Sequence, residues 1–229
     1  MEFYLLGKIH MDNKKSLPLD YKIKLSNSTK KKKPSLFLLH GYGSNEDDLF
    51  SFTPYLPPEY TIISFKAPIV LSMGGFAWSN INYDNKGNIN TAILEAKESV
   101  KLIIDSIKLS IIKFNLDDKD ISLIGFSQGC ILCWTLAMNF PNLIRRVVAL
   151  SGYIVPELID APLENISHLK VFNSHGITDQ IIPIEKARKS IDLIKTNNSK
   201  IIYKEYHEGH EINKENFSDF LNWIKTTSI

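Results

Sequence analysis

One serine in this chain stands in a pattern that suits nucleophilic chemistry. The segment Gly125-Phe126-Ser127-Gln128-Gly129 lies between an apolar run typical of a strand and a long apolar run with helical periodicity. A serine hydroxyl is a poor nucleophile at neutral pH, and a tight turn from a strand into a helix lifts it to where a base can reach it. The pattern therefore predicts that Ser127 is a nucleophile, assisted by a histidine and a carboxylate.

The chain offers six candidates for the base: His10, His40, His168, His175, His207 and His210. We favour His210, because it follows a glycine after the last predicted strand and can project inward from its loop. His207 lies nearer that strand and is interpreted as a surface or loop-supporting residue. His40 and His175 end predicted strands, but each is followed at once by glycine, which is better suited to shaping a turn.

Asp179 is the best-placed acid to orient the histidine, because its loop follows the predicted strand Val171-Phe172. Asp160 and Asp192 fall in a connecting loop and in a predicted helix. In a parallel sheet, the loops after the strands carry the chemistry. The resulting order of serine, acid and histidine along the chain is typical of α/β-hydrolases.

Two backbone N–H groups are candidates to hold the negative oxygen that develops during acyl transfer. The N–H of Gln128 follows the nucleophile at a predicted helix start, and that of Tyr42 lies in the turn His40-Gly41-Tyr42-Gly43 after a buried strand. Taken alone, this turn would equally suit an ordinary loop. The serine pattern downstream favours an oxyanion hole formed by both N–H groups.

The stretch from Ala67 to Asn90 lacks clear periodicity and is long for a loop inside a compact domain. Its large apolar side chains, Met73, Phe76 and Trp78, are predicted to wall an acyl pocket. The alternative is that Phe76 and Trp78 only pin the loop to the core. The segment after the fourth parallel strand is too brief for a lid domain, so we expect an open site.

Short apolar runs predict strands, and apolar residues at helical spacing predict helices between them. The expected strands are Leu36–Leu39, Ile62–Phe65, Ile121–Ile124, Val147–Leu150, Val171–Phe172 and Ile201–Tyr203, and the expected helices are Ala92–Phe114, Ile184–Lys195 and Asn216–Lys225, with one more after Ser127. This alternation predicts an α/β fold with a mostly parallel central sheet and helices on both faces. Two β-prone stretches, Phe3–Ile9 and Tyr21–Leu25, predict an N-terminal antiparallel hairpin at the sheet edge.

Length and composition favour a single domain over residues 1–229, with edge strands and a basic turn over 1–33 and a catalytic core over 34–226. The net charge of +2 gives no reason to expect a nucleic-acid partner, and Lys30 to Lys33 is interpreted as a solvated turn. The first residues are too weakly apolar for a signal peptide, and no run approaches the ~18 apolar residues needed to span a membrane. Cys130 and Cys133 fit a reducing compartment as buried small side chains, so a cytoplasmic protein is expected.

From Pro34 to Thr226 the chain resembles the phospholipase/carboxylesterase family of α/β-hydrolases, a group with acyl-protein thioesterases and small bacterial carboxylesterases. The motifs that carry this likeness are, in order, Leu39-His40-Gly41-Tyr42-Gly43-Ser44-Asn45-Glu46-Asp47-Asp48-Leu49, Gly75-Phe76-Ala77-Trp78, Gly125-Phe126-Ser127-Gln128-Gly129, Leu150-Ser151-Gly152-Tyr153, the segment from His175-Gly176 through Asp179 to Ile182-Pro183, and Gly209-His210. Six ordered motifs make the resemblance specific.

The resemblance implies an α/β-hydrolase fold without a lid domain. It implies Ser127 as nucleophile, His210 as base and Asp179 as its partner, with the N–H groups of Tyr42 and Gln128 as oxyanion hole. It also implies that Trp78 lies beside the acyl site and that neither a metal nor an organic cofactor is required.

The leading hypothesis is a serine hydrolase that cleaves carboxylic esters through an acyl-enzyme on Ser127, with thioesters and lysophospholipids as further candidate substrates. The expected partner is thus a small-molecule acyl ester or thioester, and the oligomeric state is left open. An acyltransferase that uses the same three residues is the nearest alternative. A non-catalytic binding protein on this scaffold is disfavoured, because a binding module does not need a matched serine, acid and histidine.

Overall fold

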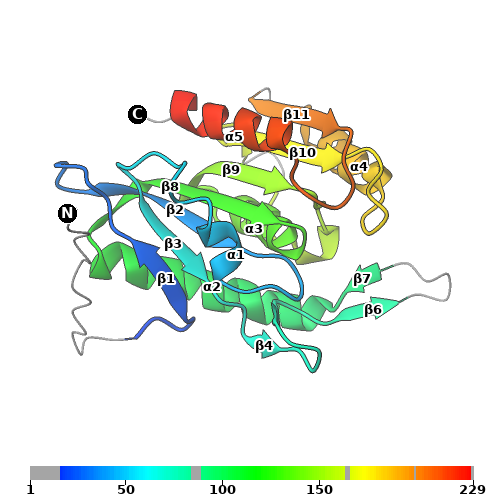
Figure 1. Cartoon of the computed structure of the whole chain (residues 1–229), viewed down its shortest axis with the longest axis horizontal. Coiled ribbons are helices and arrows are strands. Elements are labelled where there is room, and N and C mark those ends of the chain that lie inside the picture. Colours follow the sequence, from blue (N-terminus) through cyan, green and yellow to red (C-terminus); the bar gives the residue numbers. More distant parts are fainter. Residues whose placement is uncertain (1–15, 84–88, 163–165, 199, 228–229) are drawn as a thin grey trace, which may run out of the picture.

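The computed structural model describes residues 16–83, 89–162, 166–198 and 200–227. Its centre is a seven-stranded sheet in the order β1-β3-β2-β8-β9-β10-β11 (Figure 1). The strands are β1 Tyr21–Lys24, β2 Lys33–Leu39, β3 Thr61–Phe65, β8 Leu116–Phe126, β9 Ile144–Leu150, β10 Lys170–Gly176 and β11 Ile201–Tyr206. All neighbouring pairs are parallel except β1 with β3. The predicted mostly parallel sheet is thereby confirmed.

The edge of the sheet differs in one respect from the prediction. Strand β1 pairs antiparallel with β3, with Tyr21 opposite Phe65. The stretch Phe3–Ile9, predicted to be its partner, lies outside the described residues. The antiparallel edge strand is therefore present. The described partner of β1 is β3, a strand of the central sheet that lies about 40 residues further along the chain.

Helices cover both faces of the sheet, because its strands are apolar on both sides. The helices are α1 Asp47–Phe50, α2 Ile93–Lys113, α3 Gln128–Asn139, α4 Ile184–Ile194 and α5 Lys214–Thr227. Phe37 and Leu39 of β2 pack into the cluster that contains α2 and α3, whereas Leu36 and Leu38 pack into the cluster that contains α5. Figure 1 accordingly shows α2 and α5 on opposite sides of the sheet.

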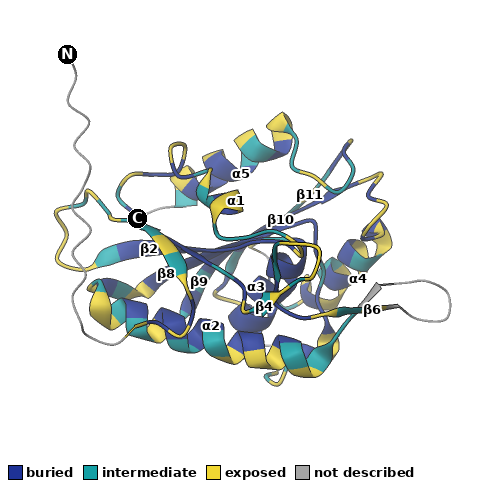
Figure 2. Cartoon of the chain, turned by 60° about the horizontal axis from the view of Figure 1, so that its bottom comes forward, coloured by how far each residue is buried: buried dark blue, intermediate teal, exposed yellow. Residues whose placement is uncertain are grey.

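Burial differs strongly among the helices (Figure 2). Helix α3 is buried from Gln128 to Met138, while α2 buries only one side. Cys130 and Cys133 of α3 are free and buried, and this burial raises the pKa of both thiols. A thiol held in its neutral form is a weak nucleophile, so both cysteines act as small core side chains. Among the described helices, none is long and apolar enough to cross a membrane.

The stretch predicted to be irregular contains two small hairpins. In the first, β4 Ile69–Val70 pairs with β5 Phe76–Ala77, and in the second, β6 Ile81–Tyr83 pairs with β7 Ile89–Thr91. Strands of two or three residues are too short to carry an alternating pattern, which is why the sequence did not reveal them.

Candidate active site

Ser127 lies at the turn between β8 and α3 in a conformation that few non-glycine residues adopt. Its φ is 54° and its ψ is −116°, and its backbone N–H donates to the carbonyl of Leu150 at the end of β9 (N···O 2.9 Å). The turn is so tight that a Cβ at Gly125 or Gly129 would overlap backbone atoms of its neighbours. Backbone strain of this kind costs about 1–3 kcal/mol and persists where the surroundings enforce it.

The structure brings Ser127, His210 and Asp179 together in one hydrogen-bonded row. His210 Nε2 lies 2.8 Å from Ser127 Oγ, and His210 Nδ1 lies 2.7 Å from Asp179 Oδ2. An ionised carboxylate can only accept, so Nδ1 carries the proton that it donates to Asp179. Nε2 is then the acceptor that faces the serine hydroxyl.

Asp179 is fully buried, and both of its oxygens have donors. Oδ1 accepts the backbone N–H groups of Ile181 and Ile182, each at 2.8 Å. Burial alone would raise the pKa of this carboxyl group, but the hydrogen bonds from His175, from His210 and from the Ile182 backbone outweigh it and hold the pKa well below the ordinary value. Asp179 is therefore a carboxylate over the whole neutral and mildly acidic range.

His175 is a contact of this acid that sequence reasoning missed. Its buried Nε2 lies 2.8 Å from the carbonyl of Ile182 and 3.3 Å from Asp179 Oδ2. Both neighbours are acceptors, so Nε2 carries the proton. The spacing of four residues between His175 and Asp179 was the available signal, but the glycine after the histidine favoured a turn.

The other histidines of the described residues lie as expected. His40 is buried and shapes the turn after β2: its Nε2 accepts the N–H of Ala67 (3.1 Å), and its Nδ1 donates to the carbonyl of Gly41 (2.8 Å). His207 is exposed, and His168 precedes β10, at the opposite end of the strand from Asp179. His10 lies outside the described residues.

The loops that carry Asp179 and His210 are fastened to each other. Thr178 donates its backbone N–H (3.1 Å) and its hydroxyl (2.9 Å) to the carbonyl of Glu208. The buried Glu208 carboxylate in turn accepts the N–H of Asn213 (2.6 Å) and the side-chain amide of Asn216 (2.7 Å). His210 therefore sits in a loop held at one side by the acid loop and at the other by the start of α5.

The two predicted oxyanion donors flank the serine. Gly41 lies against it, since a Cβ there would come within 3.4 Å of the Ser127 Cβ, and Tyr42 follows next along the chain. The backbone N–H groups of Tyr42 and Gln128 have no acceptor among the described residues. Both donors are thus available to a ligand atom at Ser127.

The side chain of Gln128 joins this turn to the loop at Trp78. Its Oε1 accepts the N–H of Trp78 (2.8 Å), and its Nε2 donates to the carbonyl of Ser79 (2.7 Å). The indole N–H of Trp78 donates to the carbonyl of His40 (2.9 Å). Trp78 therefore ties both predicted oxyanion segments together, a role that depends on tertiary contacts and has no sequence signal.

The three predicted pocket residues differ strongly in exposure. Trp78 is completely buried, so it offers no surface to a ligand, whereas the Met73 side chain is 98% exposed. Phe76 is half-buried, with the ammonium of Lys66 5.2 Å from its ring. For Trp78 the pinning alternative describes the observed packing, because the indole fills the core beneath the loop.

A small cavity of about 290 Å³ lies directly beside His210. Its walls are mostly apolar, with carboxylates among them, and its lining residues are Asp48, Leu49, Phe52, Phe126, His210, Glu211 and Ile212. A group bound at Ser127 has room to extend here past the imidazole. The described residues hold no group of three or more His, Cys, Asp and Glu side chains arranged for a metal ion.

The chain is similar to known acyl-protein thioesterases and carboxylesterases. A model of the family described as Phospholipase/Carboxylesterase matches residues 22–228. Acyl-protein thioesterase 1 of Kluyveromyces lactis is 30% identical over 182 residues, 71% of this chain and 77% of the relative, and that of Candida albicans is 24% identical over 213 residues, 84% and 91%. The carboxylesterase of Bacillus cereus superposes with a TM-score of 0.77 at 18% identity, over 91% of this chain and 94% of its own. The chain therefore belongs to the phospholipase/carboxylesterase family of α/β-hydrolases.

Proposed function

We propose that this enzyme hydrolyses carboxylic esters or thioesters through an acyl-enzyme on Ser127, with His210 as base and Asp179 as orienting acid. The observation that carries the proposal is the unbroken row from Ser127 Oγ to His210 (2.8 Å) and on to Asp179 (2.7 Å). These distances suit proton transfer without any rearrangement.

In the first half-reaction, Ser127 Oγ bonds to the carbonyl carbon of the substrate while its proton moves to His210 Nε2. The tetrahedral intermediate then breaks its bond to the leaving oxygen or sulfur, which takes the proton from Nε2. Water repeats the sequence on the acyl-enzyme, giving the acid and free Ser127. Asp179 stays ionised throughout and stabilises the imidazolium that forms twice in each cycle.

The negative oxygen of each tetrahedral intermediate would lie between the N–H groups of Tyr42 and Gln128. Both donors lack an acceptor among the described residues, which supports this assignment. Removing one such donor typically costs on the order of 100-fold or more in rate. The Gln128 N–H also opens α3, where the helix dipole favours negative charge.

The relatives support the substrate class, because they are named as acyl-protein thioesterases and carboxylesterases. Water as the final acceptor separates a hydrolase from an acyltransferase with the same three residues. Product analysis with an added short alcohol measures this directly. Predominant free acid is expected, and predominant transfer to the alcohol would replace hydrolysis by acyl transfer.

The decisive variant is Ser127→Ala, measured on 4-nitrophenyl acetate and butanoate. We expect kcat/KM to fall by at least about 10³-fold, because no other group supplies the attacking oxygen. Ser151→Ala is the matched control, since Ser151 is also a buried serine at a strand end with positive φ (50°). Equal activity losses in both variants, or retained activity in Ser127→Ala, would refute the assignment.

A further inference from the structure

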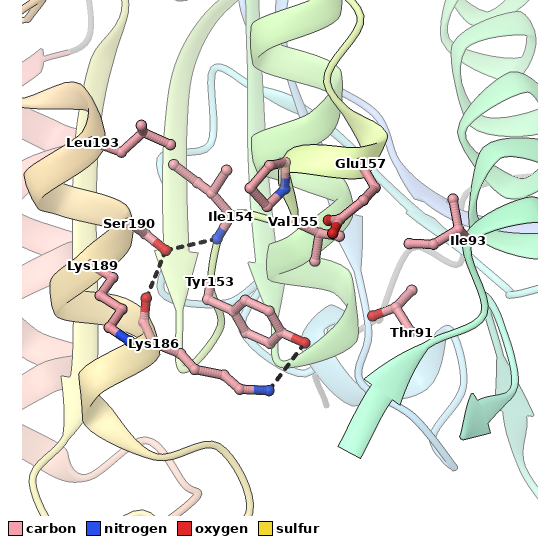
Figure 3. Close-up of a pocket in the computed structure, with 11 residues that line it drawn as sticks. Thr91, Ile93, Tyr153, Ile154, Val155, Glu157, Lys186, Lys189, Ser190 and Leu193 are labelled. Atoms are coloured by element: carbon pink, nitrogen blue, oxygen red, sulfur yellow. Dashed lines mark hydrogen bonds between the residues drawn. The ribbon is translucent and has the colours of Figure 1, made fainter. Parts of the chain in front are cut away.

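A second and larger cavity, of about 590 Å³, lies between helix α4 and the loop that follows β9 (Figure 3). Tyr153, Ile154 and Val155 line it from the loop, and Lys186, Lys189 and Leu193 line it from the helix. Ile93, at the start of α2, lines the side away from α4. The cavity is thus built from three segments that are distant in the sequence.

Both main walls of this cavity continue the segments that hold the reacting residues. The loop begins at Leu150, whose carbonyl accepts the Ser127 N–H, and a Cβ at Gly152 would lie 2.8 Å from the carbonyl oxygen of Ser127. Helix α4 begins just after the Asp179 loop, and the Lys186 N–H donates to the carbonyl of Pro183 (2.9 Å). The cavity therefore lies at the same edge of the sheet as Ser127.

The chemistry of the cavity is apolar with a cationic side. Ile154 and Val155 are buried and form apolar surface. The Lys186 ammonium lies 4.5 Å from the centroid of the Tyr153 ring and 3.5 Å from its hydroxyl (Figure 3). Cation–π contact holds the ammonium beside the Tyr153 hydroxyl, and an ammonium group is a charged donor that suits a carboxylate.

Three further charged residues lie in or near the walls of this cavity. Lys189 lies one helical turn after Lys186 and lines the same cavity. The two positive charges therefore add to the electrostatic potential inside it. Glu157 also lines the cavity, on the side away from α4 (Figure 3), and Glu185 is exposed on α4. The positive side of the cavity is therefore confined to the wall that α4 provides.

The position of His210 indicates which cavity takes the leaving group of a substrate and which takes its acyl part. A leaving group must lie next to His210 Nε2 to take its proton, and His210 lines the smaller cavity but not the larger one. The loop wall of the larger cavity packs against Ser127 at Gly152, so we assign that cavity to the acyl part. Its apolar surface suits a short methylene chain, and its lysines suit an anionic end.

We propose that the larger cavity binds an acyl group that ends in a carboxylate, so that half-esters of dicarboxylic acids are preferred over neutral esters of equal length. This inference rests on the proposed function and names its substrate class. Lys186 is the principal recognition residue, and Lys189 adds to its field.

The test compares 4-nitrophenyl monoesters of glutaric and adipic acid with 4-nitrophenyl pentanoate and hexanoate, after subtraction of uncatalysed hydrolysis. We expect wild type to show a higher kcat/KM on the anionic esters. Lys186→Met, which keeps the chain length and removes the charge, should lower the anionic-to-neutral ratio by about tenfold, mostly through KM, because a charge-assisted hydrogen bond is lost. The ratio should also fall as salt is added.

Lys195→Met is the matched control, because Lys195 follows the end of α4, is exposed and pairs with Asp192 outside the cavity. It should leave the ratio unchanged. A wild-type preference for the neutral esters, or a ratio that Lys186→Met does not change, would overturn the inference while the proposed function stands. Failure of wild type to hydrolyse any of the four esters would instead count against the proposed function.

Discussion

Two regions share one edge of the sheet but are constructed differently. The first is the polar row formed by Ser127, His210 and Asp179, and the second is the larger cavity with Lys186 and Lys189 in its wall, here called the lysine-lined cavity. The Asp179 side chain is buried, and each of its carboxylate oxygens has donors at 2.7–2.8 Å. In the cavity, Tyr153 and Lys186 are partly exposed, and the contact between ammonium and hydroxyl is long, at 3.5 Å. Under the proposed function, the difference separates groups that must be fixed for bond making from groups that only select the substrate.

This difference has an energetic reason. A buried carboxylate that loses a donor is left partly unsatisfied in a medium of low dielectric, which is costly, so the network tolerates few changes. A partly exposed ammonium exchanges one partner for water at little cost. Changes in the polar row should therefore affect rate and stability strongly, and changes in the cavity should affect selectivity alone.

Among changes to the groups that support Ser127, the largest effect is expected from Asp179→Asn. The amide keeps the shape, but it can present a donor to His210 Nδ1 and so favour the wrong tautomer. We expect kcat to fall by roughly 10³- to 10⁴-fold, measured on 4-nitrophenyl butanoate at pH 7.5. Asp192→Asn, on the exposed surface of α4, is the control and should retain wild-type kcat. Similar losses in the two variants would contradict the assignment of the acid.

The next effect concerns the loop that holds the histidine. Glu208→Gln places an amide donor against Asn213 N–H or the Asn216 amide, both of which donate to Glu208. We expect a loss of about 1–3 kcal/mol in the free energy of unfolding, measured with urea, together with a lower kcat. Glu205→Gln removes the charge from a surface pair with Arg188 and should cost less than about 1 kcal/mol. A Glu208→Gln variant as stable as wild type would show that this carboxylate does not support the loop.

Lowering the pH should reduce the contribution of Asp179 to the free energy of unfolding. The pKa of Asp179 is lowered on folding, so its contribution to stability is present above the unfolded carboxyl value of about 3.9 and is lost as pH falls through the folded value. Between about pH 5 and pH 2, wild type should lose more than about 1 kcal/mol relative to Asp179→Asn in urea unfolding. Parallel stability curves for the two proteins over this range would rule out a lowered pKa.

The smallest effect is expected in the cavity, from Tyr153→Phe. The ring stays under the Lys186 ammonium and only the hydroxyl at 3.5 Å is removed. We expect KM for the anionic esters to change by less than about threefold, with kcat unaltered, since the long contact is weak. A fall in kcat comparable to that of Asp179→Asn would erase the distinction between the two regions.

The proposed reacting residues were predictable because each follows a strand, and parallel strands end at one edge of the sheet. Ser127 follows β8, Asp179 follows β10 and His210 follows β11, so the order of elements already placed the three side chains near one another. Glycines on both sides of Ser127 marked the turn. Local pattern and topology agreed here, and the expected contacts are present.

The substrate region was not predictable for the opposite reason. Trp78 has the large apolar side chain expected of a pocket wall, but it is buried and donates to acceptors on His40 and Gln128, contacts that no local pattern reveals. The sequence indicates for Lys186 only an ordinary polar position on an amphipathic helix. Only the packing of α4 against the loop at Tyr153 puts its charge at a cavity.

Covalent labelling of Ser127 tests the central claim most directly. Wild type is treated with a fluorophosphonate, which reacts with an activated serine and not with an ordinary one, and the adduct is located by intact mass and peptide mapping. The account predicts one adduct per chain, on Ser127, which is absent from Ser127→Ala and slowed strongly in Asp179→Asn. An adduct on another residue, or ester hydrolysis that persists without any adduct at Ser127, would contradict it.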